Sequence, residues 1–150
     1  MDDFARVLFQ NAIIKEQISQ KMYINLGNQA KKEIIKKLFY KLAEEEMLHE
    51  QLFSKMDTSI LKKVNECYLK DLHLLNNNKS NILTNDTKEI NKAIDFAIDE
   101  EQRAYEDYYK LLVHLDFGEA RETLKEIAQQ ELQHRTMLQK IKIEFNNKDW

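Results

Sequence analysis

Two glutamate–histidine pairs carry the side chains with the clearest capacity for chemistry. The first pair is Glu46 with His49, and the second is Glu131 with His134. In each pair the residues are three positions apart, so on a helix they face the same side. A mixed shell of carboxylate oxygens and imidazole nitrogens suits iron or manganese better than a thiolate-seeking metal. The two pairs therefore indicate a candidate metal site.

The pairs are separated by 85 residues, and this offset relates other parts of the chain. It carries Glu16 onto Glu101, so that each pair follows a glutamate that lies 30 residues earlier. The surrounding residues obey the same offset: Ala12 onto Ala97, Ile13 onto Ile98, Gln17 onto Gln102, Tyr23 onto Tyr108 and Leu26 onto Leu111. This internal repeat predicts a duplicated helical hairpin.

Composition indicates which elements position these residues. The 150-residue chain has no proline, two glycines, 33% charged and 43% hydrophobic residues, which favours one all-α domain with long helices. The predicted helices span about residues 2–28, 31–56, 87–114 and 118–145, and a long crossover over 57–86 joins the two hairpins. Asp2 or Asp3 is the expected N-cap of the first helix, and Asp86 to Glu89 resembles a capping box for the third. The first turn is placed within residues 27–32 and its boundary stays open, whereas the second falls at 116–118.

Each predicted helix has an interior stripe in alternating steps of three and four, and the candidate ligands lie in the middle of these stripes. The charged residues off the second stripe are expected to form a solvated face: Lys36, Lys37, Lys41, Glu44 and Glu45. His73 and His114 lack a matching carboxylate pattern and receive no role. Cys67, the one cysteine, is interpreted as a small apolar filler, since it cannot form an internal disulfide.

Four inward carboxylates require compensating charge, because buried charges must be paired or coordinate a metal. Two divalent cations would balance Glu16, Glu46, Glu101 and Glu131. The small residues beside Glu16 and Glu101 leave space for them: Ala12, Ser19, Ala97 and Ala104. Tyr23 and Tyr108, two turns beyond on the same faces, are candidates to hydrogen-bond the site's carboxylates, or else ordinary core tyrosines.

A single glutamate–histidine pair also has a metal-free interpretation. In a chain with 26 acidic residues, one glutamate–histidine pair can be a surface glutamate near a packed histidine. Here, however, two of only four histidines carry the motif, and both motifs fall on interior stripes behind an interior glutamate. This combination favours the metal site.

The pattern resembles the ferritin-like superfamily of di-iron and di-manganese carboxylate bundles. Within it, the chain is most similar to the rubrerythrin-type domain, through residues 97–101 (AIDEE), residues 105–108 (YEDY), and residues 42–46 (LAEEE) with His49. The resemblance implies a ferritin-like four-helix bundle holding two iron ions, with manganese as the other candidate. The metal ligands it implies are Glu16, Glu46, His49, Glu101, Glu131 and His134. It further implies reaction with hydrogen peroxide or dioxygen in oxidative-stress defence.

Two departures from the rubrerythrin pattern bear on the reaction. The chain lacks the paired cysteines of a rubredoxin-like iron domain, so a separate electron donor, such as a rubredoxin-like protein, is expected. Rubrerythrins also have an additional glutamate near the third-helix ligand, whereas here Ile98 and Ala104 flank Glu101 by one turn and Glu100 points off the stripe. The site therefore reads as a symmetric six-ligand centre, closer to bacterioferritin or manganese catalase, which weakens the expectation of peroxidase activity.

Two other functions stay open. One is iron handling by ferrous-ion oxidation, although the short tail supplies no fifth helix of the cage-ferritin type; the other is a non-catalytic, metal-stabilised bundle. The net charge of −3 gives no electrostatic footprint for nucleic acid or an anionic membrane. No signal peptide or membrane-spanning stretch is evident, so a cytoplasmic location is expected. A homodimer would be in keeping with the superfamily.

Overall fold

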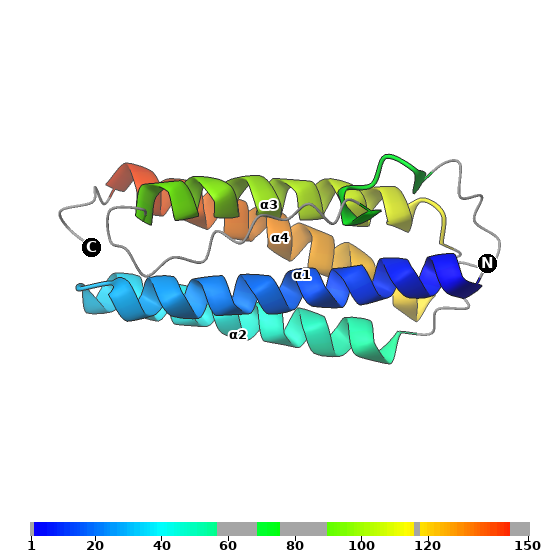
Figure 1. The fold of residues 1–150 in the computed structure, drawn as a ribbon, viewed down its shortest axis with the longest axis horizontal. Helices are drawn as coiled ribbons and strands as arrows, with labels where there is room; N and C mark the ends of the chain where they lie inside the picture. The colour runs from blue at the N-terminus through cyan, green and yellow to red at the C-terminus, as the bar shows by residue number, and fades with distance from the viewer. Residues whose placement is uncertain (1, 57–68, 76–89, 116–117, 145–150) are drawn as a thin grey trace.

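The computed structural model describes residues 2–56, 69–75, 90–115 and 118–144. These residues form four long α-helices and one short 3-10 helix, and none of them forms a β-strand. The elements are α1 (Asp2–Gln29), α2 (Glu33–Lys55), η3 (His73–Leu75), α3 (Ile90–Leu112) and α4 (Glu119–Glu144). All four long helices run along the long axis of the molecule (Figure 1). The predicted all-α four-helix bundle is confirmed.

The helices form two hairpins, in which α1 packs along α2 and α3 packs along α4 (Figure 1). The first turn lies between Gln29 and Glu33, within the range that the sequence predicted. Gly27 remains inside α1, so it does not break the helix. Gly27 instead allows α1 and α2 to approach closely, because a Cβ atom at this position would lie 2.5 Å from Cε1 of Tyr40 on α2. The small residue therefore lets the hairpin close tightly.

In the second hairpin, Gly118 precedes α4 with a φ of 157°. Residues with a side chain rarely adopt this backbone conformation, which explains a glycine here. The Gly118 carbonyl accepts a hydrogen bond from the Glu122 amide at 3.1 Å, so it begins the helical hydrogen-bonding pattern of α4. Several predicted features lie outside the described residues: the side-chain caps at Asp2 or Asp3, the capping box at 86–89, Cys67, and the crossover except 69–75.

The described core consists of two apolar clusters. One contains Phe9, Phe53, Leu111 and Leu124, near the start of α1 and the end of α2. The other lies near the opposite end of the bundle, and Leu26, Ile35, Phe39, Ile94 and Leu138 belong to it. Burial of large side chains of this kind contributes about 1.5–3 kcal/mol each, so the two clusters hold the helices in register. The candidate ligands lie in the helix segments between them.

The described part of the crossover, residues 69–75, contacts both α1 and α3. Asn11 of α1 donates a hydrogen bond from Nδ2 to the Leu74 carbonyl at 2.6 Å. The buried carboxylate of Asp107 on α3 accepts from the backbone amides of His73 and Leu74, at 3.0 and 2.8 Å. This segment therefore ties the first helix of one hairpin to the first helix of the other.

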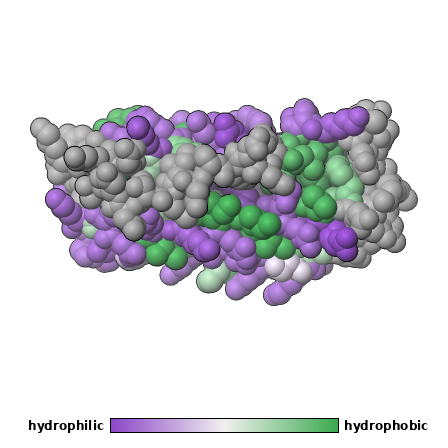
Figure 2. Space-filling model, viewed as in Figure 1, coloured by the Kyte–Doolittle hydropathy of each residue, from purple (hydrophilic) through white to green (hydrophobic). Residues whose placement is uncertain are grey.

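The outer surface is mainly hydrophilic on the face that Figure 2 shows, with apolar residues between the charged ones. The charged residues of α2 include Lys37 and Lys41, which are exposed as predicted. Among the described helices, none has an apolar stretch sufficient to span a membrane.

Candidate metal centre

Four helices each contribute to one buried group of carboxylates and imidazoles. All six candidate ligands are at most 2% exposed: Glu16 from α1, Glu46 and His49 from α2, Glu101 from α3, and Glu131 and His134 from α4. They form two sets of four in which one ligand atom from each residue lies within 4.8 Å of the others. The first set joins Glu16 and His49 to Glu46 and Glu131; the second joins Glu101 and His134 to the same two glutamates. Glu46 and Glu131 thus lie where bridging ligands would.

One atom from each of the six residues is buried without a well-directed hydrogen bond, although Nδ1 of His49 and of His134 form ion pairs with Glu131 and Glu46 at 2.9 and 2.7 Å. These atoms are Oε2 of Glu16, Oε1 of Glu46, Nδ1 of His49, Oε2 of Glu101, Oε1 of Glu131 and Nδ1 of His134. Buried polar atoms are normally satisfied, so a group of unsatisfied ones needs an explanation. All six atoms are electron-pair donors suited to a metal ion, and each comes from a different predicted ligand. The donor set fits a dinuclear centre.

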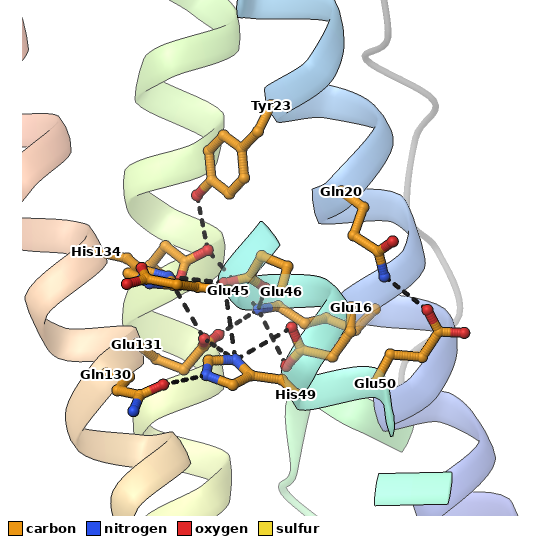
Figure 3. Close-up of polar contacts among 12 residues, drawn as sticks. Glu16, Gln20, Tyr23, Glu45, Glu46, His49, Glu50, Gln130, Glu131 and His134 are labelled. Carbon is orange, nitrogen blue, oxygen red and sulfur yellow. Dashed lines mark hydrogen bonds and ion pairs between the residues drawn. The ribbon is translucent and has the colours of Figure 1, made fainter. Parts of the chain in front are cut away.

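The two imidazole rings are aligned by partners from the opposite hairpin (Figure 3). His49 Nε2 lies 2.6 Å from Oε1 of Gln130, and His134 Nε2 lies 2.7 Å from Oε2 of Glu45. Because each partner atom is an acceptor, each Nε2 carries the proton. Nδ1 then faces the carboxylates, which is the nitrogen that a metal ion in the site would bind.

Glu45 corrects a sequence-based expectation. It was placed on the solvated outer face of α2, but its side chain is only 32% exposed and contacts His134 on α4. Gln130 occupies the equivalent position in the second hairpin, 85 residues later, and contacts His49. The duplication could have revealed this pair, since each residue directly precedes a candidate bridging glutamate.

The two tyrosines also cross between hairpins. Tyr23 donates its hydroxyl hydrogen to Oε1 of Glu101 at 2.7 Å, and Tyr108 donates to Oε1 of Glu16 at 2.8 Å (Figure 3 shows the Tyr23 bond). Both tyrosines are fully buried. Each hydrogen bond leaves the second oxygen of its glutamate free for a metal ion, so the tyrosines orient the carboxylates.

Comparison with models of protein families identifies the family of the chain. A family model described as Rubrerythrin matches residues 8–142, which covers most of the sequence and all the candidate ligands. The chain belongs to the rubrerythrin family. Comparisons with curated proteins and with solved structures gave no match. Family membership and the buried carboxylate–histidine cluster together support metal binding at this site.

Sequence reasoning also missed the buried cation of this rubrerythrin-family centre, Lys15. Its side chain is 4% exposed, and its ammonium lies within 3.8 Å of an oxygen from each of the four glutamates. A signal for its burial was present. Leu8, Ala12, Lys15, Ser19, Met22 and Leu26 form a second interior row on α1 in steps of three and four, and all are buried.

Lys15 makes the two halves of the centre electrostatically unequal. Burial alone lowers the pKa of Lys15, but the four surrounding carboxylates outweigh this and hold the pKa well above its ordinary value. Burial raises the pKa of Glu46, and its acidic neighbours raise it further. For Glu131 burial acts in the same direction, but the charges of Lys15 and His49 dominate and hold the pKa well below its ordinary value. The pKa values of the two duplicated glutamates are therefore shifted in opposite directions.

The same carboxylates raise the pKa values of the two imidazoles. Burial lowers the pKa of His49, but hydrogen bonding and charge from Glu131 and Glu16 raise it to about 11. The pKa of His134 is likewise raised, against the effect of burial, by Glu101, Glu45 and Glu46. Since a metal ligand must offer a lone pair, binding at Nδ1 releases the proton that the carboxylates favour.

The positions one turn from Glu101 carry no carboxylate. Ala104 is buried in one apolar cluster, and Ile98 packs against the other. Glu100 is buried as well, although it lies off the predicted stripe; Arg103 donates to it at 2.9 Å. Glu100 does not belong to either candidate ligand set.

Proposed function

We propose that this rubrerythrin-family protein is a non-haem di-iron carboxylate oxidoreductase that reduces hydrogen peroxide or dioxygen in oxidative-stress defence. The observation that carries the proposal is the convergence of six buried ligands from four helices, in two sets of ligand atoms that share Glu46 and Glu131. Manganese would suit the same oxygen and nitrogen donors.

The chain's own residues have separable tasks in this proposal. Glu46 and Glu131 belong to both ligand sets and would bridge the ions. Glu16 and Glu101 would be terminal ligands, each oriented by a tyrosine of the other hairpin. When bound, two iron ions supply one electron each between their ferrous and ferric states, which matches the two electrons that reduce one peroxide to water. The apolar clusters on both sides limit the access of bulk water.

Electrons must be restored after each turnover, and the part of the chain that the structure describes contains no second candidate metal cluster. We propose that a separate rubredoxin-like protein is the donor. The absence of a carboxylate at Ile98 and Ala104 means that the ligand exchange available to rubrerythrins with the additional glutamate is not available from these positions.

The first test is metal analysis of protein purified without oxygen, followed by titration of the ferrous protein with hydrogen peroxide. We expect about two iron ions per chain, as in other di-iron bundles. Near-ultraviolet ferric absorption should then grow until one peroxide per iron pair is consumed. A variant with His49→Ala and His134→Ala is the control, because it removes both nitrogen ligands.

Two results would argue against the proposal. Fewer than about half an ion per chain after anaerobic reconstitution with iron or manganese would mean that the cluster is not a metal centre. Oxidation of added ferrous ions by dioxygen, with the product retained and no cycling by an electron donor, would favour iron handling instead.

A further inference from the structure

Lys15 lies among the same carboxylates that the proposed metal ions would use. Its Nζ is 2.5 Å from Oε2 of Glu131 and 3.5 Å from Oε2 of Glu46. It is 3.8 Å from Oε1 of both Glu16 and Glu101. A buried lysine within reach of all four glutamates is a cation of the site and not a surface residue.

The lysine divides the carboxylate oxygens into two groups. It faces one oxygen of each glutamate. The other oxygen of each glutamate lies 2.7–3.6 Å from an imidazole Nδ1. An ammonium group on one oxygen of a bridging carboxylate would lie close to the metal ion bound by that oxygen, and the two cations would repel each other. Glu46 and Glu131, the candidate bridges, each offer Oε2 to Lys15.

We propose that Lys15 competes with the second of two divalent metal ions and must leave the site before that ion binds. This inference rests on the proposed metal binding. Once both imidazoles have lost their extra protons, as metal ligation requires, four ionised glutamates and Lys15 have a net charge of −3. One divalent ion reduces this to −1, whereas two would give +1 while the lysine stays. Without the lysine, two ions give a neutral centre. The second ion is therefore favoured once the ammonium has left, because the two cations repel each other.

The displaced side chain has an acceptor nearby. A small cavity between α1 and α3 is lined by Lys15, Ser19, Met22, Phe96 and Glu100. Glu100 is the counterpart of Lys15 in the duplication, 85 residues later, and its carboxylate is buried. Rotation of Lys15 toward this carboxylate would keep the ammonium paired outside the metal centre.

The test compares Lys15→Met with the wild-type chain, using Mn²⁺ and the electron paramagnetic resonance signal of the free ion. Methionine keeps an unbranched side chain that is one atom shorter, and it removes the charge. We expect the second Mn²⁺ to bind at least about tenfold more tightly to the variant, because its competitor is gone. Thermal unfolding without metal should show the opposite effect, a lower midpoint, because four buried carboxylates lose their cation. Lys21→Met, at an exposed position of α1, should change neither quantity.

In Lys15→Met, the affinity for the second Mn²⁺ should rise while the unfolding midpoint of the metal-free protein falls. A lysine that only supports the fold would, when replaced, lower both metal affinity and the unfolding midpoint, and that result would overturn the proposal. Unchanged affinity for both ions would overturn it as well. If Lys15→Met does not fold without metal, Lys15→Gln offers neutral donors in its place, and the same tightening of the second ion is expected. Absence of Mn²⁺ and Fe²⁺ binding to every variant would instead contradict the proposed metal site itself, together with this inference.

The direction of displacement has its own test. Glu100→Gln should weaken the second Mn²⁺ in the wild-type background, because the displaced ammonium loses its acceptor. In the Lys15→Met background the same change should have no effect. An equal effect in both backgrounds would show that Glu100 does not receive the lysine.

Discussion

At the scale of single residues, each half of the centre depends on groups from the other half. His49 and His134 are aligned by residues of the opposite hairpin, and so are Glu16 and Glu101, the proposed terminal ligands. The duplication is not perfect, because Glu45 corresponds to Gln130 and Lys15 to Glu100. The centre has a symmetric set of ligands and an asymmetric set of supporting charges.

Replacing the histidine partners should weaken metal binding without unfolding the bundle. Glu45→Ala and Gln130→Ala each release one imidazole Nε2, and loss of such a partner typically costs about 10–100-fold in metal affinity. Glu45→Ala should have the larger effect, because it also removes a negative charge beside His134. Competition with a chromophoric chelator measures both affinities. Glu44→Ala, the exposed neighbour, is the control, and equal losses in all three variants would contradict the assigned roles.

Removal of either tyrosine hydroxyl should reduce stability by a similar amount. Tyr23→Phe and Tyr108→Phe each delete one buried hydrogen bond to a carboxylate, for which we expect a loss of about 1–3 kcal/mol in the free energy of unfolding. Urea unfolding of the metal-free variants measures it. Tyr109→Phe on α3 serves as the comparison. A loss confined to one of the two site tyrosines would mean that the cross-hairpin bonds are not equivalent.

At the scale of elements, the two hairpins are joined by shared apolar clusters, by the polar contacts of the candidate centre and by the described part of the crossover. Asp107 is the link within that segment, because its buried carboxylate accepts from two backbone amides at the start of η3. Burial raises the pKa of this carboxyl, while the two amides act to lower it. Asp107 was not identified from the sequence, although it lies on the same interior row of α3 as Glu100 and Ala104.

Asp107→Ala should therefore destabilise the protein more than an ordinary surface substitution. It leaves two backbone amides without their acceptor, and each buried unsatisfied group costs about 1–3 kcal/mol. Denaturant unfolding measures the loss, and hydrogen exchange at the His73 and Leu74 amides should show reduced protection. Asp99→Ala, at an exposed position of the same helix, provides the control. Unchanged exchange at these two amides would rule out the capping role.

At the scale of the whole molecule, a polar layer lies between two apolar clusters. The clusters fix the four helices, and the layer between them concentrates four carboxylates that repel one another. Lys15 and the two imidazoles offset part of this repulsion. Metal ions of higher charge would offset more of it, so stability should depend on metal.

Addition of a bound divalent ion should raise the thermal unfolding midpoint. At a free concentration of one hundred times the dissociation constant, one site contributes about 2.7 kcal/mol. For a domain of this size that corresponds to roughly 5–10 °C. Differential scanning calorimetry with Mn²⁺ and with a chelator measures the shift. The His49→Ala and His134→Ala double variant should show no shift, and an equal shift in that variant would place the stabilising ion elsewhere.

The sequence by itself determined the helical class, the internal duplication and the interior stripes. Alternating steps of three and four are a local property of each helix, and the offset of 85 residues is visible without coordinates. The six candidate ligands and the two tyrosines could be named for this reason. The turn at Gly27 was less certain, because a glycine that permits close packing has the same local signature as one that ends a helix.

Only the tertiary structure decided which groups meet across the hairpins. The contacts of Lys15 with Glu131, and of Glu45 with His134, join residues more than 80 positions apart and depend on how the helices are rotated. Charged residues are usually exposed, so their type argued against burial in both cases. Their positions became understandable once four carboxylates were seen to surround one point, because a cation is then more stable inside the bundle than an unpaired negative charge.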